Sequence, residues 1–116
     1  MNKAALSVQI FGIYLIGLGA CLLLAPNVLL RLFGMAATDE VWIRVVGMLV
    51  GFLGTYYVRA AAVRFTPFFA WTVPVRLSVF GFFGAFVLLG LAPPVLLLFA
   101  LVDAAGALWT WRALRH

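Results

Sequence analysis

The chain has 116 residues, of which 67% are hydrophobic and only 9% are charged, and its formal net charge is +5. A soluble domain has roughly a quarter of its residues charged, so polar side chains could not cover the surface of this chain in water. The length allows one domain, and the composition predicts that much of its surface faces lipid.

The basic and metal-binding side chains exclude further classes of function. The eight Lys and Arg residues are scattered at the edges of apolar runs, as cytoplasmic flanks of membrane spans are, so we expect no nucleic-acid partner. The single cysteine, Cys21, excludes an internal disulfide, and the only histidine is the last residue, His116. We therefore expect no metal site built on His and Cys, and no cofactor.

The first two apolar runs, 4–25 and 41–62, are each long enough to cross a bilayer core, which needs about 20 helical residues. Asp39 is expected to cap the second helix, and Glu40 suits the positive end of its dipole. Between the two runs, residues 28–35 are too short to span a bilayer. We expect an interfacial half-helix or a structured loop there.

The end of the first run also resembles a cleavage signal. Residues 18–21, with the sequence LGAC, are similar to the lipobox of bacterial lipoproteins, at which cleavage would remove the first helix and acylate Cys21. The single lysine before the run, Lys3, and the length of the run favour a retained helix. Cys21 would then be a small thiol packed within it.

The third run lies between Pro67 and Leu91, and its helix has two candidate starts. If Thr66 and Pro67 cap the helix, Pro74 becomes an internal kink. If the helix instead starts near 72–74, the residues before it form an aromatic belt in the membrane interface. That belt would consist of Phe68, Phe69 and Trp71. We prefer the second start, which gives a span over 73–91 with about 18 apolar positions.

The fourth run, 93–111, begins at Pro93 and Pro94, which suit a helix start because a missing N–H costs nothing there. The loop before it is very short, so the third and fourth helices must be antiparallel neighbours. The sequence therefore predicts an all-α integral membrane protein, an antiparallel up-down bundle of four helices.

The basic residues predict the orientation of this bundle. With the N-terminus inside, most of them fall on the cytoplasmic side, where such residues accumulate. These are Lys3, Arg59, Arg64, Arg112 and Arg115, with Arg76 close by. Arg31 and Arg44 remain outside, next to acidic residues. We therefore expect both termini in the cytoplasm.

Asp103 is the strongest candidate for chemistry, because it is ionisable and lies about 15 Å from the outer end of the fourth span, near the midplane. Its helical face is rich in small residues, which mark the close-packed side of a membrane helix. That face consists of Phe99, Ala100, Gly106, Ala107 and Thr110. Arg76, about 7 Å deeper, and Arg44, about 10 Å above, are its candidate partners. Asp103 is either half of an ion pair that fixes helix packing or a carboxylate that carries a proton or binds a ligand.

Glu40 and Arg44 have the spacing of an ion pair on a helix surface. Arg44 is either satisfied within that pair or an anchor for an anionic head group near the outer leaflet. Gly47, Gly51 and Gly54 lie on nearly the same face as Arg44. Like Gly106 in the fourth helix, they would let helices approach closely, in the core or in a dimer.

Gln9, Tyr56 and Arg76 fall at similar depths and could line a polar pocket open to the cytoplasm. Tyr56 and its neighbour Tyr57 have a simpler interpretation as belt residues at the membrane interface. No nucleophile–base pair, phosphate-binding glycine loop or pair of acids at catalytic spacing is found, so the chain is not expected to be an enzyme.

Five short motifs resemble a group of small uncharacterised bacterial membrane proteins and, more distantly, the DoxX-like superfamily of four-helix membrane proteins. The motifs are PNxLLxLFG at 26–34, DEVWIRVVGxL at 39–49, GxYYxxAA at 54–61, FxxWTVxxR at 68–76 and APPxLLxFxxVDxxGALWT at 92–110. The resemblance implies a four-helix fold, a location in the inner membrane of a bacterium and, for some relatives, accessory roles in membrane oxidoreductases. It implies no catalytic residue for this chain.

The chain is also similar in length and number of spans to small multidrug-resistance transporters. That family uses a membrane-embedded glutamate in the first helix, where this chain has no acid. The sequence favours a non-enzymatic accessory or assembly subunit, or a binder of a lipid-like or small apolar ligand such as a quinone. A proton-coupled transporter that uses Asp103 is the alternative, and an intramembrane enzyme ranks third. The expected partners are the bilayer and a homodimer or a larger membrane complex.

Overall fold

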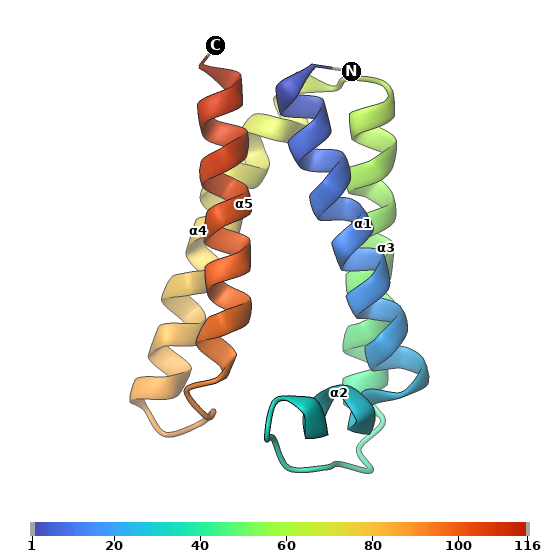
Figure 1. Cartoon of the computed structure of the whole chain (residues 1–116), viewed down its shortest axis with the longest axis vertical. Coiled ribbons are helices and arrows are strands. Elements are labelled where there is room, and N and C mark those ends of the chain that lie inside the picture. Colours follow the sequence, from blue (N-terminus) through green and yellow to red (C-terminus); the bar gives the residue numbers. More distant parts are fainter. Residues whose placement is uncertain (1, 116) are drawn as a thin grey trace. The chain divides into compact units, whose positions relative to one another are not determined.

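The structure, a computed structural model, describes residues 2–115, so His116 lies outside the described residues. Over that range the protein has five α-helices and no strand. The helices are α1 (Lys3–Leu24), α2 (Pro26–Leu32), α3 (Trp42–Ala62), α4 (Thr66–Leu88) and α5 (Leu96–Leu114) (Figure 1). Four of them, α1, α3, α4 and α5, are long and apolar enough to cross a membrane. The predicted all-helical class is confirmed.

The helices form two compact units. The α1–α3 unit runs from Gln9 to Arg59 and contains most of α1, all of α2 and most of α3. The α4–α5 unit combines the chain up to Val8 with everything from Ala60 onward. Both long helices of the first unit therefore contribute their ends to the second.

In the α1–α3 unit, glycines bring the two long helices into backbone contact. A Cβ atom on Gly19 of α1 would lie 2.5 Å from the backbone nitrogen of Gly51 and 2.6 Å from the carbonyl oxygen of Gly47. One on Gly54 of α3 would lie 2.7 Å from the carbonyl oxygen of Gly12. Because any side chain would collide there, only glycine permits this approach. The order of the contacts shows that α1 and α3 are antiparallel.

The connection between α1 and α3 is fixed by side-chain hydrogen bonds. The Asn27 amide of α2 donates to the Thr38 carbonyl (3.2 Å) and accepts from the Thr38 N–H (2.9 Å). The Thr38 hydroxyl in turn accepts from the N–H of Glu40 (3.1 Å). These bonds hold the chain outside the helix until Trp42, so the expected cap at Asp39 is wrong. Of the half-helix and the structured loop expected at 28–35, the structure has a short helix, α2, which begins two residues earlier and ends three residues earlier.

The start of α4 also differs from the preferred prediction. The helix begins at Thr66 and contains Pro74, so the start near 72–74 is wrong and the alternative at Thr66 and Pro67 is observed. Pro67 lies in the first turn, where its missing N–H costs nothing. Downstream, α5 begins at Leu96 because residues 93–95 form turns, with the Leu96 N–H bonded to the Pro93 carbonyl (3.1 Å).

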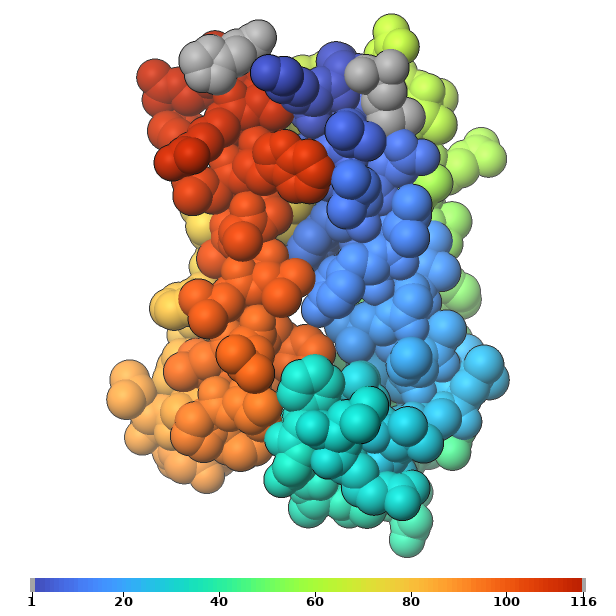
Figure 2. Space-filling view, in the orientation of Figure 1, coloured from blue at the N-terminus to red at the C-terminus, as the bar shows by residue number. Residues whose placement is uncertain are grey.

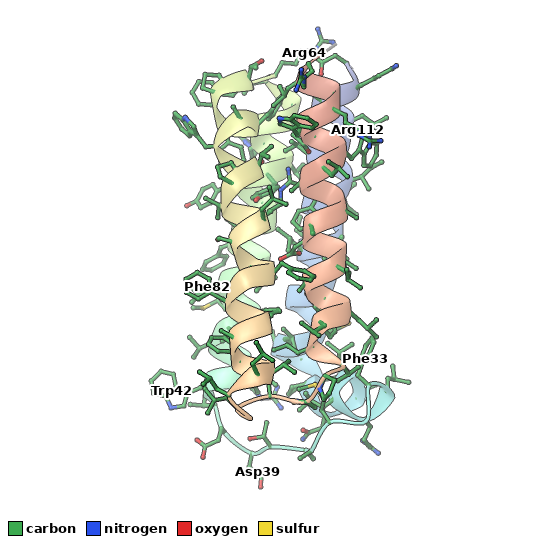
Figure 3. All side chains as sticks on the ribbon, turned by 90° about the vertical axis from the view of Figure 1, so that its left-hand side faces the viewer. Phe33, Asp39, Trp42, Arg64, Phe82 and Arg112 are labelled. Carbon is green, nitrogen blue, oxygen red and sulfur yellow. The ribbon has the colours of Figure 1, made fainter. Side chains whose placement is uncertain are left out.

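In the α4–α5 unit, the two helices lie side by side and antiparallel (Figures 1 and 3). Many of their buried residues are small. The larger buried residues lie near the start of α4, where the first turns of α1 also pack. The buried apolar residues of this unit include Ala4, Val8, Phe69, Val73, Ala100 and Ala107.

Large apolar side chains are exposed along all four long helices. Examples are Ile13 (56%), Phe52 (57%), Phe82 (62%) and Leu101 (53%). In Figure 2 the blue side chains of α1 and the orange and red side chains of α5 form continuous strips along these helices. Such surfaces are unfavourable in water and suit contact with lipid.

Candidate functional site

The most unusual residue of the α4–α5 unit is Arg76, a guanidinium that is only 2% exposed. It lies on α4 one turn after Thr72, so the two side chains share a helix face. Its Nη2 donates to the Thr72 hydroxyl (2.9 Å), and its Nε donates to the Thr72 carbonyl (3.3 Å). A buried charge is tolerated only with such partners.

A second helix supplies another hydroxyl. Nη2 of Arg76 also donates to the Thr110 hydroxyl of α5 at 2.8 Å. The Thr110 and Ser7 hydroxyls are 2.8 Å apart, and Ser7 lies in the first turns of α1. Thr110 is 0% exposed and Ser7 is 1% exposed. These contacts join α1, α4 and α5 through one arginine cluster, which consists of Ser7, Thr72, Arg76 and Thr110.

The protons of this cluster have a defined direction. The Ser7 hydroxyl donates to the Ala4 carbonyl (2.7 Å), so it accepts the proton of Thr110. The Thr72 hydroxyl likewise donates to the Phe69 carbonyl (2.8 Å). Both threonine oxygens therefore present lone pairs to the guanidinium while their protons point away from it. Aligned dipoles of this kind stabilise a buried positive charge.

Asp103 lies half-buried on α5, two helical turns before Thr110 and on the same face. Its carboxylate is close enough to the Arg76 guanidinium for the two charges to interact electrostatically. Buried Ala100 and Ala107 share this face, which packs α5 against its neighbours. The structure thus brings two of the predicted site residues, Asp103 and Arg76, into one charged region of the α4–α5 unit.

Arg44 lies in the other unit and has a different role from the one its spacing suggested. Its Nη1 donates to the carbonyl oxygens of Leu23 (2.5 Å) and Leu24 (3.5 Å), at the end of α1. A cation there satisfies open carbonyls and suits the negative end of the helix dipole. In the described part of the chain no ion pair joins Arg44 to Glu40, because Glu40 precedes the helix.

The neighbouring tyrosines of α3 differ in exposure, and so do the contacts of its predicted packing glycines. Tyr56 is 66% exposed, whereas Tyr57 is 3% exposed and its ring centroid lies 5.6 Å from that of Phe11. Gln9 is half-buried in the same unit. Among the predicted packing glycines, a Cβ on Gly51 would meet nothing within 4 Å, although its backbone contacts α1.

Gly47 and Gly54 do face α1. A Cβ on Gly47 would lie 2.6 Å from the Leu23 backbone nitrogen, and one on Gly54 would lie 2.8 Å from the Ile16 backbone nitrogen. Gly106 of α5 is half-buried. The contact therefore follows the two-turn spacing of Gly47 and Gly54 rather than the one-turn spacing of Gly47 and Gly51.

The sequence analysis did not predict the two hydroxyls that bond to Arg76, those of Thr72 and Thr110, or the Ser7 hydroxyl that bonds to Thr110. The Thr72–Arg76 spacing was a usable signal, since residues four apart meet on a helix face. Thr110 was recognised only as a neighbour of Asp103. Nothing local in the sequence points to Ser7, because its contact with Thr110 joins the two ends of the chain.

The chemistry available at this site is that of paired charges and hydroxyls. In the part of the chain that the structure describes, no three His, Cys, Asp or Glu side chains gather in a way that could hold a metal ion. Comparisons with protein-family profiles, with curated proteins and with solved structures found no match. The function is therefore inferred from the site itself.

Proposed function

We propose that this protein is a non-enzymatic integral membrane protein that serves as an accessory or assembly subunit in a bacterial inner membrane. In this proposal its four long helices form an antiparallel up-down bundle with both termini in the cytoplasm. The support is the length and apolar surface of the helices. In addition, most of the basic residues fall on one side of the membrane in the predicted topology. A larger membrane complex, a homodimer or a lipid-like ligand would cover part of that surface.

The observation that carries this proposal is the arginine cluster. Arg76 is directed at hydroxyl and carbonyl oxygens of its own chain, and these interactions join three helices at one point. A buried polar network of this kind specifies how helices pack. Its parts are those of a structural joint: a cation, three hydroxyls and a nearby carboxylate, without a nucleophile–base pair.

The test is to substitute the charged residues of this region and to measure thermal stability and assembly in the same samples. Arg76→Ala and Asp103→Asn should lower the apparent melting temperature in mild detergent, while Arg59→Ala, at an exposed position on α3, should leave it unchanged. Native mass spectrometry of the same samples reports oligomers and co-purifying lipid, quinone or protein. Variants that keep full thermal stability but lose an associated partner or ligand would contradict a structural role for the cluster.

A second candidate function is proton-coupled transport, and the observation that favours it is Asp103. This acid lies in the middle of an apolar helix, half-buried and within electrostatic range of a buried cation. Intramembrane acids of this kind often carry protons. Uptake into proteoliposomes should then depend on pH in the wild type and lose that dependence in Asp103→Asn. An unchanged pH profile in Asp103→Asn would remove this candidate.

A further inference from the structure

Between residues 2 and 115, three helices end with the same backbone hydrogen bonds. In each, one residue adopts a positive φ, its N–H bonds to the carbonyl three residues earlier, and the next N–H bonds to the carbonyl five residues before it. This arrangement is the Schellman motif. The residues with positive φ are Gly34 after α2 (φ 70°), Arg64 after α3 (φ 54°) and Gly90 after α4 (φ 76°).

Arg64 is the exception among the three. Its N–H bonds to the Ala61 carbonyl (3.1 Å), and the Phe65 N–H bonds to the Ala60 carbonyl (2.9 Å), so the turn is as regular as the two glycine turns. A residue with a Cβ is disfavoured in this left-handed conformation, where glycine is at ease. The turn therefore keeps an arginine side chain at a conformational cost that the two glycine turns avoid, and strain of this kind collects at binding sites.

The Arg64 turn lies at the most basic end of the α4–α5 unit. Because α5 is antiparallel to α4, the end of α5 lies beside the start of α4, and the Ser7–Thr110 contact brings the start of α1 to the same end. Figure 3 shows Arg64 and Arg112 near this same end of the unit. Lys3 and Arg115 also lie at the helix ends that meet there. We call these four exposed residues, Lys3, Arg64, Arg112 and Arg115, the basic cluster.

The basic cluster has little compensating negative charge. The one acidic side chain in this unit, over its described residues, is Asp103, about 13 Å along α5 from Arg112. The cluster also has an apolar border. Val63 and Phe65, on either side of Arg64, are 73% and 48% exposed. Arg115 lies over the Trp111 ring, with its guanidinium carbon 4.7 Å from the ring centroid.

We propose that the Arg64 turn, with Lys3, Arg112 and Arg115, is a binding site for the phosphate of an anionic phospholipid. The cations would contact the head group, while the bordering apolar side chains would contact the start of the acyl chains. A soluble anion would use the charges but not the apolar border, which is why the proposal commits to a lipid. It rests on the proposed membrane location, but on neither the accessory nor the transport role.

The experiment measures lipid binding to the whole chain in phosphatidylcholine nanodiscs with and without phosphatidylglycerol, using native mass spectrometry. The wild type should retain phosphatidylglycerol in preference to phosphatidylcholine. Arg64→Gly restores the residue that the turn prefers and should weaken that preference about fivefold, the usual effect of one basic residue at an anionic surface. Arg64→Lys keeps the charge and should retain the preference. Arg31→Gln, at an exposed arginine of α2, is the matched control.

Two measurements keep the outcome decisive. The melting temperature of Arg64→Gly should be equal to or above that of the wild type, so loss of lipid cannot be attributed to unfolding. An unchanged preference in Arg64→Gly, or equal competition by glycerol phosphate in solution, would overturn the lipid site. Failure of the wild type to insert into nanodiscs would instead contradict the proposed membrane function.

Discussion

The two units of this protein hold their helices together by opposite means. In the α1–α3 unit, glycines remove side chains so that two backbones touch, as between Gly12 and Gly54. In the α4–α5 unit, a buried arginine and three hydroxyls provide directional contacts between helices. In lipid, where the hydrophobic effect gives helices no reason to associate, close packing and polar contacts are the two available routes. This chain uses one in each unit.

The largest expected effect comes from removing the cation of the polar unit. Arg76→Ala removes the hydrogen bonds that the Thr72 and Thr110 hydroxyls accept, and it leaves the Asp103 charge without the nearby cation. The unfolding free energy should fall by about 3–5 kcal/mol, the usual cost of removing one partner from a group of buried, interacting charges. Chemical unfolding in mixed micelles measures it. A loss below that of an exposed control, Arg59→Ala, would mean that the cluster does not hold the α4–α5 unit together.

The glycine contact should break next. Gly19→Ala places a methyl group 2.5 Å from the Gly51 backbone nitrogen, which cannot move aside without shifting α3. The expected loss is about 1–3 kcal/mol, typical of overpacking. Gly17 of the same helix is the matched control, because a Cβ there meets nothing within 4 Å.

Gly17→Ala should therefore be neutral or slightly stabilising, since alanine favours the helix. The same apparent-melting assay measures both variants. If the two alanines have equal effects, α1 and α3 are not in backbone contact, and the contrast between the units disappears.

The hydroxyls of the polar unit give a smaller effect that reports connectivity. Ser7→Ala should cost about 1 kcal/mol, the usual contribution of a hydrogen bond. Thr110→Val should cost more, about 1.5–3 kcal/mol, because Thr110 also accepts a hydrogen bond from the Arg76 guanidinium. Because Thr110 donates to Ser7, the double variant should cost less than the sum of the two single ones. A double-mutant cycle measures this coupling, and strict additivity would show that the two hydroxyls act independently.

The difference between the units also explains how far the sequence was informative. Four long apolar helices follow directly from composition and run length, and the isolated charges at Asp103 and Arg76 identify the polar region. The start of α4 did not follow, because Thr66–Pro67 and 72–74 both carry helix-start signals. In the structure the helix is continuous from Thr66 through Pro74, which decides between them. Ser7 was not predictable, since its partner Thr110 lies at the other end of the chain.

Substitution of Arg44 should give the smallest change in unfolding free energy. It tests whether the close contact between α1 and α3 depends on the arginine at the end of α1. Its guanidinium bonds to the carbonyls of Leu23 and Leu24, just beyond the point where Gly47 meets α1. Arg44→Gln should cost about 0.3–1 kcal/mol, the usual value of an exposed cation at a helix C-terminus. Arg31→Gln, also exposed but bonded only weakly within α2 (3.4 Å), is the control.

Hydrogen exchange of the last turn of α1 locates the effect of this change. Faster exchange there in Arg44→Gln, with the Gly12 region unchanged, is expected if the arginine fixes only the helix end. Faster exchange along the whole of α1 would show instead that the glycine contact depends on Arg44. Backbone packing alone would then be insufficient in the α1–α3 unit, and both units would depend on an arginine that contacts a neighbouring helix.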